Sequence, residues 1–390
     1  HAVILKPGKE KAIRNRHHWI FSGAIQSLPK TFLDGDFLPV YSSAGDFLGS
    51  GYFNRQSKII GRMVTFDQTP PLECLKQRLE AALSLRRAFF DQEATNAYRL
   101  VNGEGDGLPG LIIDLYDRVI VLQSSTLGMD RLKSYIVDFL IESLHPLAIY
   151  EKSNLSVRKE EGLEQTQGYL YGKPVQEVQF RENGLRFATS LEHSQKTGFF
   201  LDHREMRQWV RELAHGKKVL NAFSYTGGFT VYALAGGAKA ADSMDSSKEA
   251  LETARRHVAD NGFDVESQQF YCSDAFKFLR EQDLSSYDLV ILDPPAFAKR
   301  QKDLIQACRG YKDINRLAMQ KMPRGSLLLT CSCSHYVDDL LFQKVLFQAA
   351  IEAKREVKII GRHRQAMDHP INLFHPETHY LKSFLLFIGP

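Results

Sequence analysis

Short apolar runs separated by turn residues fill the first seventy positions of the chain. Residues 37–41 and 59–64 read as strands, and turn signals recur at Pro29, Asp34-Gly35 and Ala44-Gly45. Runs of this length between glycine- and proline-containing turns are typical of β-structure. The pattern predicts a small β domain over residues 1–70, ended by Pro70-Pro71.

The next stretch mixes helical and strand periodicity. Residues 72–90 place leucine and alanine at helical spacing, which predicts a helix, and a second helix is expected near 129–143. Short apolar runs predict strands at 111–114, 119–123, 147–151, 168–171 and 176–180. We therefore expect a small α+β middle domain over residues 72–184.

Strand and helix patterns alternate from residue 185 to the end. The pattern predicts strands at 218–222, 239–244, 267–271, 288–292, 325–330 and 383–388, with helices such as 246–261 between them. Such alternation indicates an α/β domain with a doubly wound, mostly parallel sheet over residues 185–390.

Composition excludes some classes of protein. The chain has 390 residues, 43% of them hydrophobic and 25% charged, as expected for a globular protein of several domains. No apolar run approaches the roughly 20 residues of a membrane helix, so no membrane association is expected. The five cysteines lack metal-site spacing, which predicts free thiols, a cytoplasmic location and no metal.

Basic residues gather in two stretches. Residues 1–30 hold six lysines and arginines against one acid, and residues 299–324 hold eight, beginning with Lys299, against two acids. Two such stretches in a chain of net charge +4 suggest a nucleic-acid partner, although a solvated surface would look the same. In the first stretch Trp19 is expected in the domain core, with the charged side chains exposed.

The most informative segment is residues 288–297, in which an apolar strand runs into Asp293-Pro294-Pro295. Proline cannot donate to a strand ladder, so pairing should stop near Asp293. Asp293 would then lie at the carboxyl end of a central strand, where open α/β sheets place their ligands. Pro294 and Phe297 are candidates for stacking on a flat ring.

A second candidate site follows the first strand of this domain. Asn221 leads into Phe223, Tyr225 and Gly227, a strand-to-helix turn in which glycine allows close approach of a ligand. The GxGxxG dinucleotide fingerprint is absent, and aromatic residues would crowd a pyrophosphate. The loop therefore suits a nucleoside that carries an amino acid rather than a phosphate.

Two further acids follow the next strands. Asp245 could accept hydrogen bonds from both ribose hydroxyls, and Asp274 could hold the adenine amino group. Each acid also precedes a helix and could instead be its N-cap. Their order on consecutive strands favours a nucleoside cofactor.

The order of these residues resembles class I S-adenosylmethionine-dependent methyltransferases. The segments 195–204 and 329–335 are more specific, and resemble the RlmI-like large-subunit ribosomal RNA cytosine-C5 methyltransferases over nearly the whole chain. The resemblance implies an N-terminal PUA RNA-binding domain, a Rossmann-like methyltransferase domain, S-adenosylmethionine as cofactor and ribosomal RNA as partner. It also makes Lys196 and Arg204 candidates for the methionine carboxylate and Phe199 a candidate for packing on the cofactor.

Methylation of cytosine C5 calls for a nucleophile, because C5 attacks an electrophilic methyl poorly until a thiolate has added to C6. Cys331 and Cys333 follow the predicted fifth strand, 326–330, beside the Asp293 loop. The resemblance places the nucleophile at Cys333, with Cys331 as the fallback, and both could instead be small buried hydrophobes. Asp293 is expected to bond the N3/N4 edge of the base.

Other activities remain open at this point. An exocyclic-amine methyltransferase, acting on guanine N2 or adenine N6, usually carries an aromatic residue directly after Asp-Pro-Pro, where this chain has Ala296. A non-catalytic RNA-binding assembly factor would keep the fold without chemistry. His335, Asp293 and a water are alternative acceptors of the C5 proton, and a homodimer is one option for the assembly state.

Overall fold

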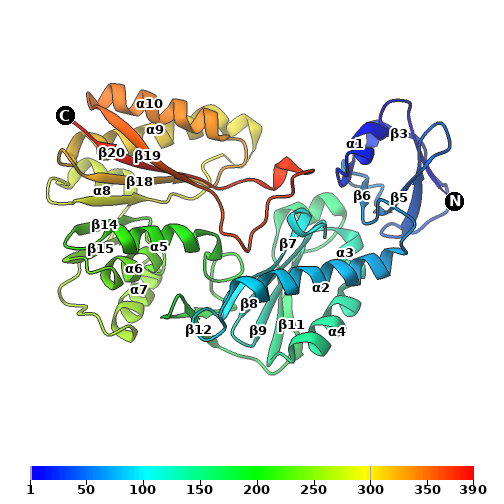
Figure 1. Ribbon diagram of the computed structural model, residues 1–390, viewed down its shortest axis with the longest axis horizontal. Helices are drawn as coiled ribbons and strands as arrows, with labels where there is room; N and C mark the ends of the chain where they lie inside the picture. The colour runs from blue at the N-terminus through cyan, green and yellow to red at the C-terminus, as the bar shows by residue number, and fades with distance from the viewer. Residues whose placement is uncertain (1, 299) are drawn as a thin grey trace. The chain divides into compact units, whose positions relative to one another are not determined.

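The computed structural model describes residues 2–298 and 300–390, so Lys299 of the second basic stretch lies outside the described residues. The chain forms two compact units (Figure 1). Unit 1 comprises residues 1–184, 188–201 and 367–378, and unit 2 comprises 185–187, 202–366 and 379–390. The three domain boundaries expected from the sequence stay predictions, and each unit is described by itself.

The N-terminal part of unit 1 is a six-stranded sheet in the order β2-β6-β5-β4-β1-β3. Its strands are β1 (Val3–Leu5), β2 (Trp19–Ile20), β3 (Ile25–Ser27), β4 (Phe37–Tyr41), β5 (Phe47–Phe53) and β6 (Gly61–Met63), with the short helices α1 (Glu10–Arg14) and η1 (Ser22–Ala24). Alternate residues such as Val3, Leu5 and Val40 point into a common apolar core. The small β domain predicted from the sequence is confirmed.

The second part of unit 1 is a five-stranded sheet, β11-β10-β9-β8-β7, packed against α2 and α4. The elements are α2 (Pro71–Phe89), β7 (Ala97–Asn102), η2 (Gly103–Asp106), β8 (Leu111–Tyr116), β9 (Val119–Ser124), α3 (Leu127–Arg131), α4 (Lys133–Leu144), β10 (Ala148–Ser153), η3 (Ser156–Glu161) and β11 (Thr166–Gly172). The pair β12 (Glu177–Glu182) and β13 (Leu185–Ser190) follows. Strand β7 was not predicted, because Arg99 and Asn102 interrupt its apolar pattern.

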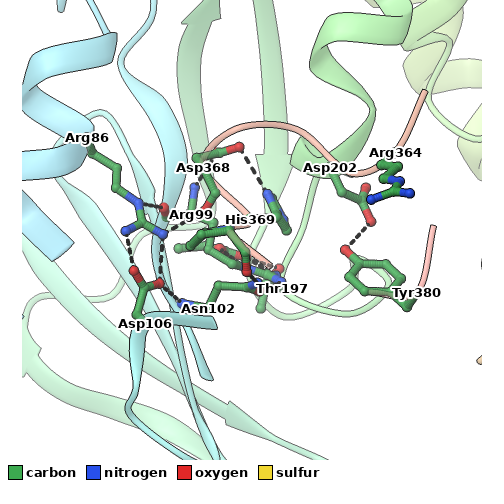
Figure 2. Close-up of polar contacts among 12 residues, drawn as sticks. Arg86, Arg99, Asn102, Asp106, Thr197, Asp202, Arg364, Asp368, His369 and Tyr380 are labelled. Carbon is green, nitrogen blue, oxygen red and sulfur yellow. Dashed lines mark hydrogen bonds and ion pairs between the residues drawn. The ribbon is translucent and has the colours of Figure 1, made fainter. Parts of the chain in front are cut away.

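Residues 367–378, including η6 (Pro376–Thr378), form a strap that packs within unit 1. The Asp368 carboxylate accepts the Arg99 amide at 2.8 Å, and its carbonyl accepts the Arg86 guanidinium at 2.7 Å. Arg86 is fully buried and also forms an ion pair of 2.6 Å with Asp106 (Figure 2). The strap is therefore fixed by buried, charge-assisted hydrogen bonds.

Unit 2 is built on a seven-stranded sheet in the order β16-β15-β14-β17-β18-β20-β19. The strands are β14 (Lys218–Ala222), β15 (Ala240–Asp245), β16 (Phe270–Cys272), β17 (Leu289–Leu292), β18 (Leu327–Ser332), β19 (Val357–His363) and β20 (Lys382–Ile388). The first five in chain order are parallel, and β20 is antiparallel to both neighbours. Strand β19 was not predicted, because this edge strand is largely exposed and has no continuous apolar run.

Helices cover both faces of the sheet in unit 2, which confirms the doubly wound prediction (Figure 1). They are η4 (Leu201–His203), α5 (Arg204–Leu213), α6 (Gly228–Ala235), α7 (Lys248–Asp260), α8 (Ala275–Glu281), η5 (Gln301–Asp303), α9 (Leu304–Lys321) and α10 (Asp339–Ala353). Along β17, Leu289 and Ile291 pack towards α5 and α6, whereas Val290 and Leu292 pack towards α8, α9 and α10. Among the described residues, no helix is both long enough and apolar enough to span a bilayer.

Candidate active site

The sheet of unit 2 has a topological switch point at β14. This strand pairs with β15 on one side and with β17 on the other; the connection from β14 runs to β15, whereas the connection from β17 runs the opposite way, to β18. Open α/β sheets bind ligands outside the carboxyl ends of the strands at such a point. The loops after β14 and β17 carry the candidate residues Asn221 to Gly227 and Asp293.

The loop after β14 has an unusual backbone. Phe223 and Tyr225 have positive φ values of 60° and 48°, and Gly227, at 77°, is the N-cap of α6. Non-glycine residues in this region cost about 1–3 kcal/mol each, and such strain gathers at binding sites. A Cβ at Gly227 would lie 2.8 Å from the Ala254 Cβ, so glycine is required there.

Asp245 holds this loop from the tip of β15. One carboxylate oxygen accepts the Tyr225 amide at 2.8 Å, and the other accepts the Ser247 amide at 2.9 Å. Ser247 caps α7, so the alternative of Asp245 as the N-cap is wrong. A carboxylate with two oxygens has further acceptor positions, which leaves room for ribose hydroxyls.

Asp274 is a helix N-cap, the alternative role that the sequence analysis left open. It is the N-cap of α8, and its carboxylate accepts the Lys277 amide at 2.9 Å. The side chain is exposed. The second carboxylate oxygen could still accept from the adenine amino group, so that contact stays a prediction.

Polar atoms are buried beneath the loop. The Asn221 amide donates to Thr230 at 2.9 Å, and Thr230 is 2.7 Å from the Ser243 hydroxyl. Within residues 2–298 and 300–390, the Asn221 Oδ1 and the Ser224 hydroxyl are buried without a hydrogen-bond partner. Such atoms call for a ligand or water, and this donor and acceptor set fits a nucleoside.

Asp293 follows β17 and forms an ion pair of 3.1 Å with the buried His203 Nε2. Burial alone would lower the pKa of His203, but the charge and hydrogen bond of Asp293 outweigh it and raise the pKa. The sequence analysis did not single out His203. The only signal was its place in segment 195–204, next to Arg204.

The two cysteines differ in their surroundings. Cys331 lies inside β18, not after it as predicted, and is fully buried with its sulfur 3.4 Å from the Ser383 hydroxyl. Burial, followed by the nearby Asp293, raises the pKa of the Cys331 thiol well above its usual value. Ligand atoms of His203, Asp293 and Cys331 lie within 4.8 Å of one another, but this pKa shift opposes the thiolate that a metal would bind.

Cys333 follows β18 and is only partly buried, with its sulfur 3.9 Å from the Pro294 carbonyl oxygen. The buried Lys382 donates to the carbonyls of Ser334 and Tyr380 at 2.6 and 2.7 Å. Burial lowers the pKa of Lys382 to about 8, although the interaction with Cys333 opposes that shift. A cation beside a thiol favours the thiolate.

The loop after Asp293 is fixed by a polar and aromatic cluster. The Ser334 hydroxyl accepts the Ala298 amide at 3.2 Å and lies 2.7 Å from the Tyr311 hydroxyl. The Phe297 ring packs on Tyr311 with centroids 4.6 Å apart. Pro294 is buried, so it cannot stack on a base as predicted; Phe297 is half-buried.

The remaining candidates divide between the units. Arg204 begins α5 in unit 2 and is 3% exposed. Lys196 and Phe199 belong to unit 1, and Lys196 is exposed. The Phe199 amide donates to the Tyr116 hydroxyl at 3.0 Å, and that hydroxyl donates to the Phe199 carbonyl at 3.1 Å. Lys152, also buried in unit 1, fixes this segment by donating to the Leu191 and Ser194 carbonyls at 2.7 and 2.6 Å.

The two basic stretches are unequal. The lysines and arginines of residues 1–30 are all exposed, as expected. In α9, by contrast, Lys312 and Arg316 are paired with Glu352 and Asp313. Trp19 is half-buried with its indole N–H 2.8 Å from Glu104, because its polar edge needs an acceptor; the core prediction is wrong.

Two family profiles match the chain. The one described as S-adenosylmethionine-dependent methyltransferase covers residues 148–363, and the one described as PUA-like domain covers residues 3–66. Together with the switch-point loops, they define a methyltransferase with a PUA-like N-terminal domain. Its cofactor is S-adenosylmethionine.

Similar proteins match this chain over nearly their whole length. "Ribosomal RNA large subunit methyltransferase I" of Alteromonas mediterranea is 43% identical, and that of Aliivibrio fischeri 42%, each over 98% of both chains. A solved structure described as a SAM-dependent methyltransferase of Streptococcus mutans covers 99% of both chains with a TM-score of 0.83 and 25% identity. Another methyltransferase, solved as a complex with SAH, has a TM-score of 0.85, 26% identity and the same coverage. The chain belongs to the family of ribosomal RNA large subunit methyltransferase I, which confirms the resemblance.

Proposed function

We propose that this chain methylates large-subunit ribosomal RNA and forms 5-methylcytosine through a transient bond between Cys333 and C6 of the base. The relatives' names support the RNA substrate. The observation that carries the cytosine chemistry is the contrast between two thiols. Cys331 is fully buried, whereas Cys333 is accessible, follows β18 and approaches the Asp293-Pro294 loop of the neighbouring β17.

Cys333 acts as the nucleophile in this proposal. Its thiolate adds to C6, the C5–C6 double bond opens, and the electron pair makes C5 nucleophilic. When bound, S-adenosylmethionine supplies the methyl group that C5 accepts. Loss of the C5 proton then re-forms the double bond as the sulfur–C6 bond breaks, which returns Cys333.

Asp293 and His203 serve the base. Asp293 would bond the N3/N4 edge of cytosine, where its carboxylate accepts from the N4 amino group and holds the ring for thiolate addition. His203, at 3.1 Å, holds the Asp293 carboxylate in position. Lys382 favours the reactive thiolate from within the core.

The cofactor would be held by the loops on the other side of the switch point. Asp245 suits the ribose, Asp274 the adenine, and Arg204 the carboxylate of the methionine part. Asn221 and Ser224 offer buried polar atoms below Phe223, Tyr225 and Gly227. From unit 1, Lys196 and Phe199 remain candidates by family resemblance.

The test uses RNA in which 5-fluorocytidine replaces cytidine. Fluorine at C5 cannot leave as a proton, so the Cys333–C6 bond should persist as a complex that survives denaturing electrophoresis. The complex should form with wild type and with Cys331→Ser but not with Cys333→Ser.

Other results would contradict the proposal. An adduct in Cys333→Ser would reassign the nucleophile. Methylation of an exocyclic amine, found by mass mapping of the product, would point to the alternative chemistry. Failure of the wild type to bind S-adenosylmethionine would leave an RNA-binding assembly factor.

A further inference from the structure

Three metal-ligating side chains from opposite ends of the chain meet in unit 1. His17 precedes β2, and His375 and Glu377 belong to the strap of residues 367–378. A ligand atom of each lies within 4.8 Å of the other two. The Glu377 carboxylate is 3.2 Å from His17 Nε2 and 3.8 Å from His375 Nε2.

His375 is the anomaly in this group. It is 1% exposed, and neither ring nitrogen has a hydrogen-bond partner within the described parts of the chain. A buried imidazole without a partner is costly, and an unseen ion or water is the usual explanation. A neutral imidazole offers the lone pair of one ring nitrogen to a metal.

The spacing fits a tetrahedral ion. Bonds of about 2.0–2.2 Å in tetrahedral geometry separate neighbouring ligand atoms by roughly 3.3–3.5 Å. The two distances to Glu377 fall on either side of that value. The rings of His17 and His375 have centroids 4.2 Å apart and planes inclined at 34°, so they would separate by about 1 Å to reach ideal tetrahedral geometry.

The neighbouring side chains His18 and Glu104 already have hydrogen-bond partners, so we do not include them among the metal ligands. His18 Nδ1 donates to the Met63 carbonyl oxygen at 2.8 Å, and the Glu104 carboxylate accepts the Trp19 indole N–H. The Trp19 amide donates to His17 Nδ1 at 3.2 Å, which places the proton of a neutral His17 ring on Nε2. An ion at Nε2 would move that proton to Nδ1, so binding costs one hydrogen bond and is weaker in acid.

We propose that His17, His375 and Glu377 form a binding site for a divalent transition-metal ion of the zinc class. Two imidazole nitrogens and one carboxylate oxygen are ligands that zinc accepts, and the partly exposed Glu377 leaves the fourth position to solvent. The ion would tie the strap to the N-terminal β domain within unit 1. The cysteine spacing gave no sign of such a site, because its ligands are two histidines and a glutamate far apart in the sequence.

Trp19 provides a direct readout. Its ring is 4.5 Å from His375 and 5.8 Å from His17, and the only other tryptophan of the chain is Trp209. In a Trp209→Phe background of the untagged full chain, stripped with chelator, Co²⁺ should quench the Trp19 emission saturably at one equivalent. Zn²⁺ should compete with the cobalt, and calorimetry should give a dissociation constant for Zn²⁺ in the micromolar range or below.

Variants separate a built site from scattered surface histidines. Glu377→Gln and His17→Gln should each weaken Zn²⁺ binding at least tenfold, whereas the exposed His215→Gln should leave it unchanged. Since both site positions are partly exposed, these variants should fold, which circular dichroism checks. Absence of saturable binding, or equal affinity in all three variants, would overturn the proposal. Methyl transfer is not needed for any of these measurements.

Discussion

The two sides of the switch point are built differently. On the β14–β15 side, the site is made by the backbone: residues with positive φ form the loop, and Asp245 holds it through two amides. On the β17–β18 side, side chains from separate segments hold one another, as in Asp293 with His203 and Ser334 with Tyr311. The loop built by the backbone suits binding of a cofactor that is the same in every reaction. The side-chain contacts on the other side suit groups that take part in the chemistry.

This contrast makes Cys333→Ser the change with the largest expected effect. Loss of the nucleophile should lower kcat by about four orders of magnitude or more, because no thiolate would then add to C6. The dissociation constant of S-adenosylmethionine should stay within about twofold. Single-turnover methylation of RNA together with calorimetry measures both, and Cys331→Ser, at a fully buried position, is the matched comparison. Loss of turnover in Cys331→Ser alone would reverse the assignment.

Asp293→Asn should have the next largest effect. It keeps the shape of the side chain but removes the charge that pairs with His203, and kcat should fall by about 10²–10³-fold. Binding of S-adenosylmethionine should change far less than turnover. A loss confined to cofactor affinity would place Asp293 on the cofactor side and remove the distinction between the two sides.

Asp245→Asn tests the backbone-built side. One of its oxygens becomes a donor, so a charge-assisted hydrogen bond is lost, and S-adenosylmethionine should bind roughly 10–100-fold more weakly. Asp274→Asn, at an exposed helix cap, should weaken binding by less than about fivefold. Equilibrium dialysis of the two variants makes the comparison. Equal losses would mean that both acids contact the cofactor to the same extent.

His203→Gln should have the smallest effect, seen in the pH dependence of stability. Because Asp293 raises the pKa of His203 in the folded state, protonation contributes stability that is fully present below the unfolded value of about 6.5. That contribution is lost as the pH rises through the higher folded value. The thermal midpoint of the wild type should therefore fall relative to His203→Gln between pH 6 and pH 8.5. A constant difference between the two proteins would mean that His203 does not titrate there.

The sequence predicted what depends on local pattern. Leu289–Leu292 is a continuous apolar run that Asp293 follows directly, and Asp245 ends a predicted strand, so both the sheet and the edge that carries the site could be predicted. It did not reveal His203 or Lys382, because a single buried polar residue has no periodic signal. Trp19 was misjudged because its partner, Glu104, is distant in the sequence.

The strap has an evolutionary consequence. The backbone passes between the two units at 184/185, 187/188, 201/202, 366/367 and 378/379. A genetic crossover after residue 201 would combine the first half of one gene with residues 367–378, including Asp368 and Glu377, from another. That first half was selected together with its own version of the strap. The Arg99 amide and His17 would then face unmatched partners, so the two halves of the gene are expected to be inherited together rather than exchanged between lineages.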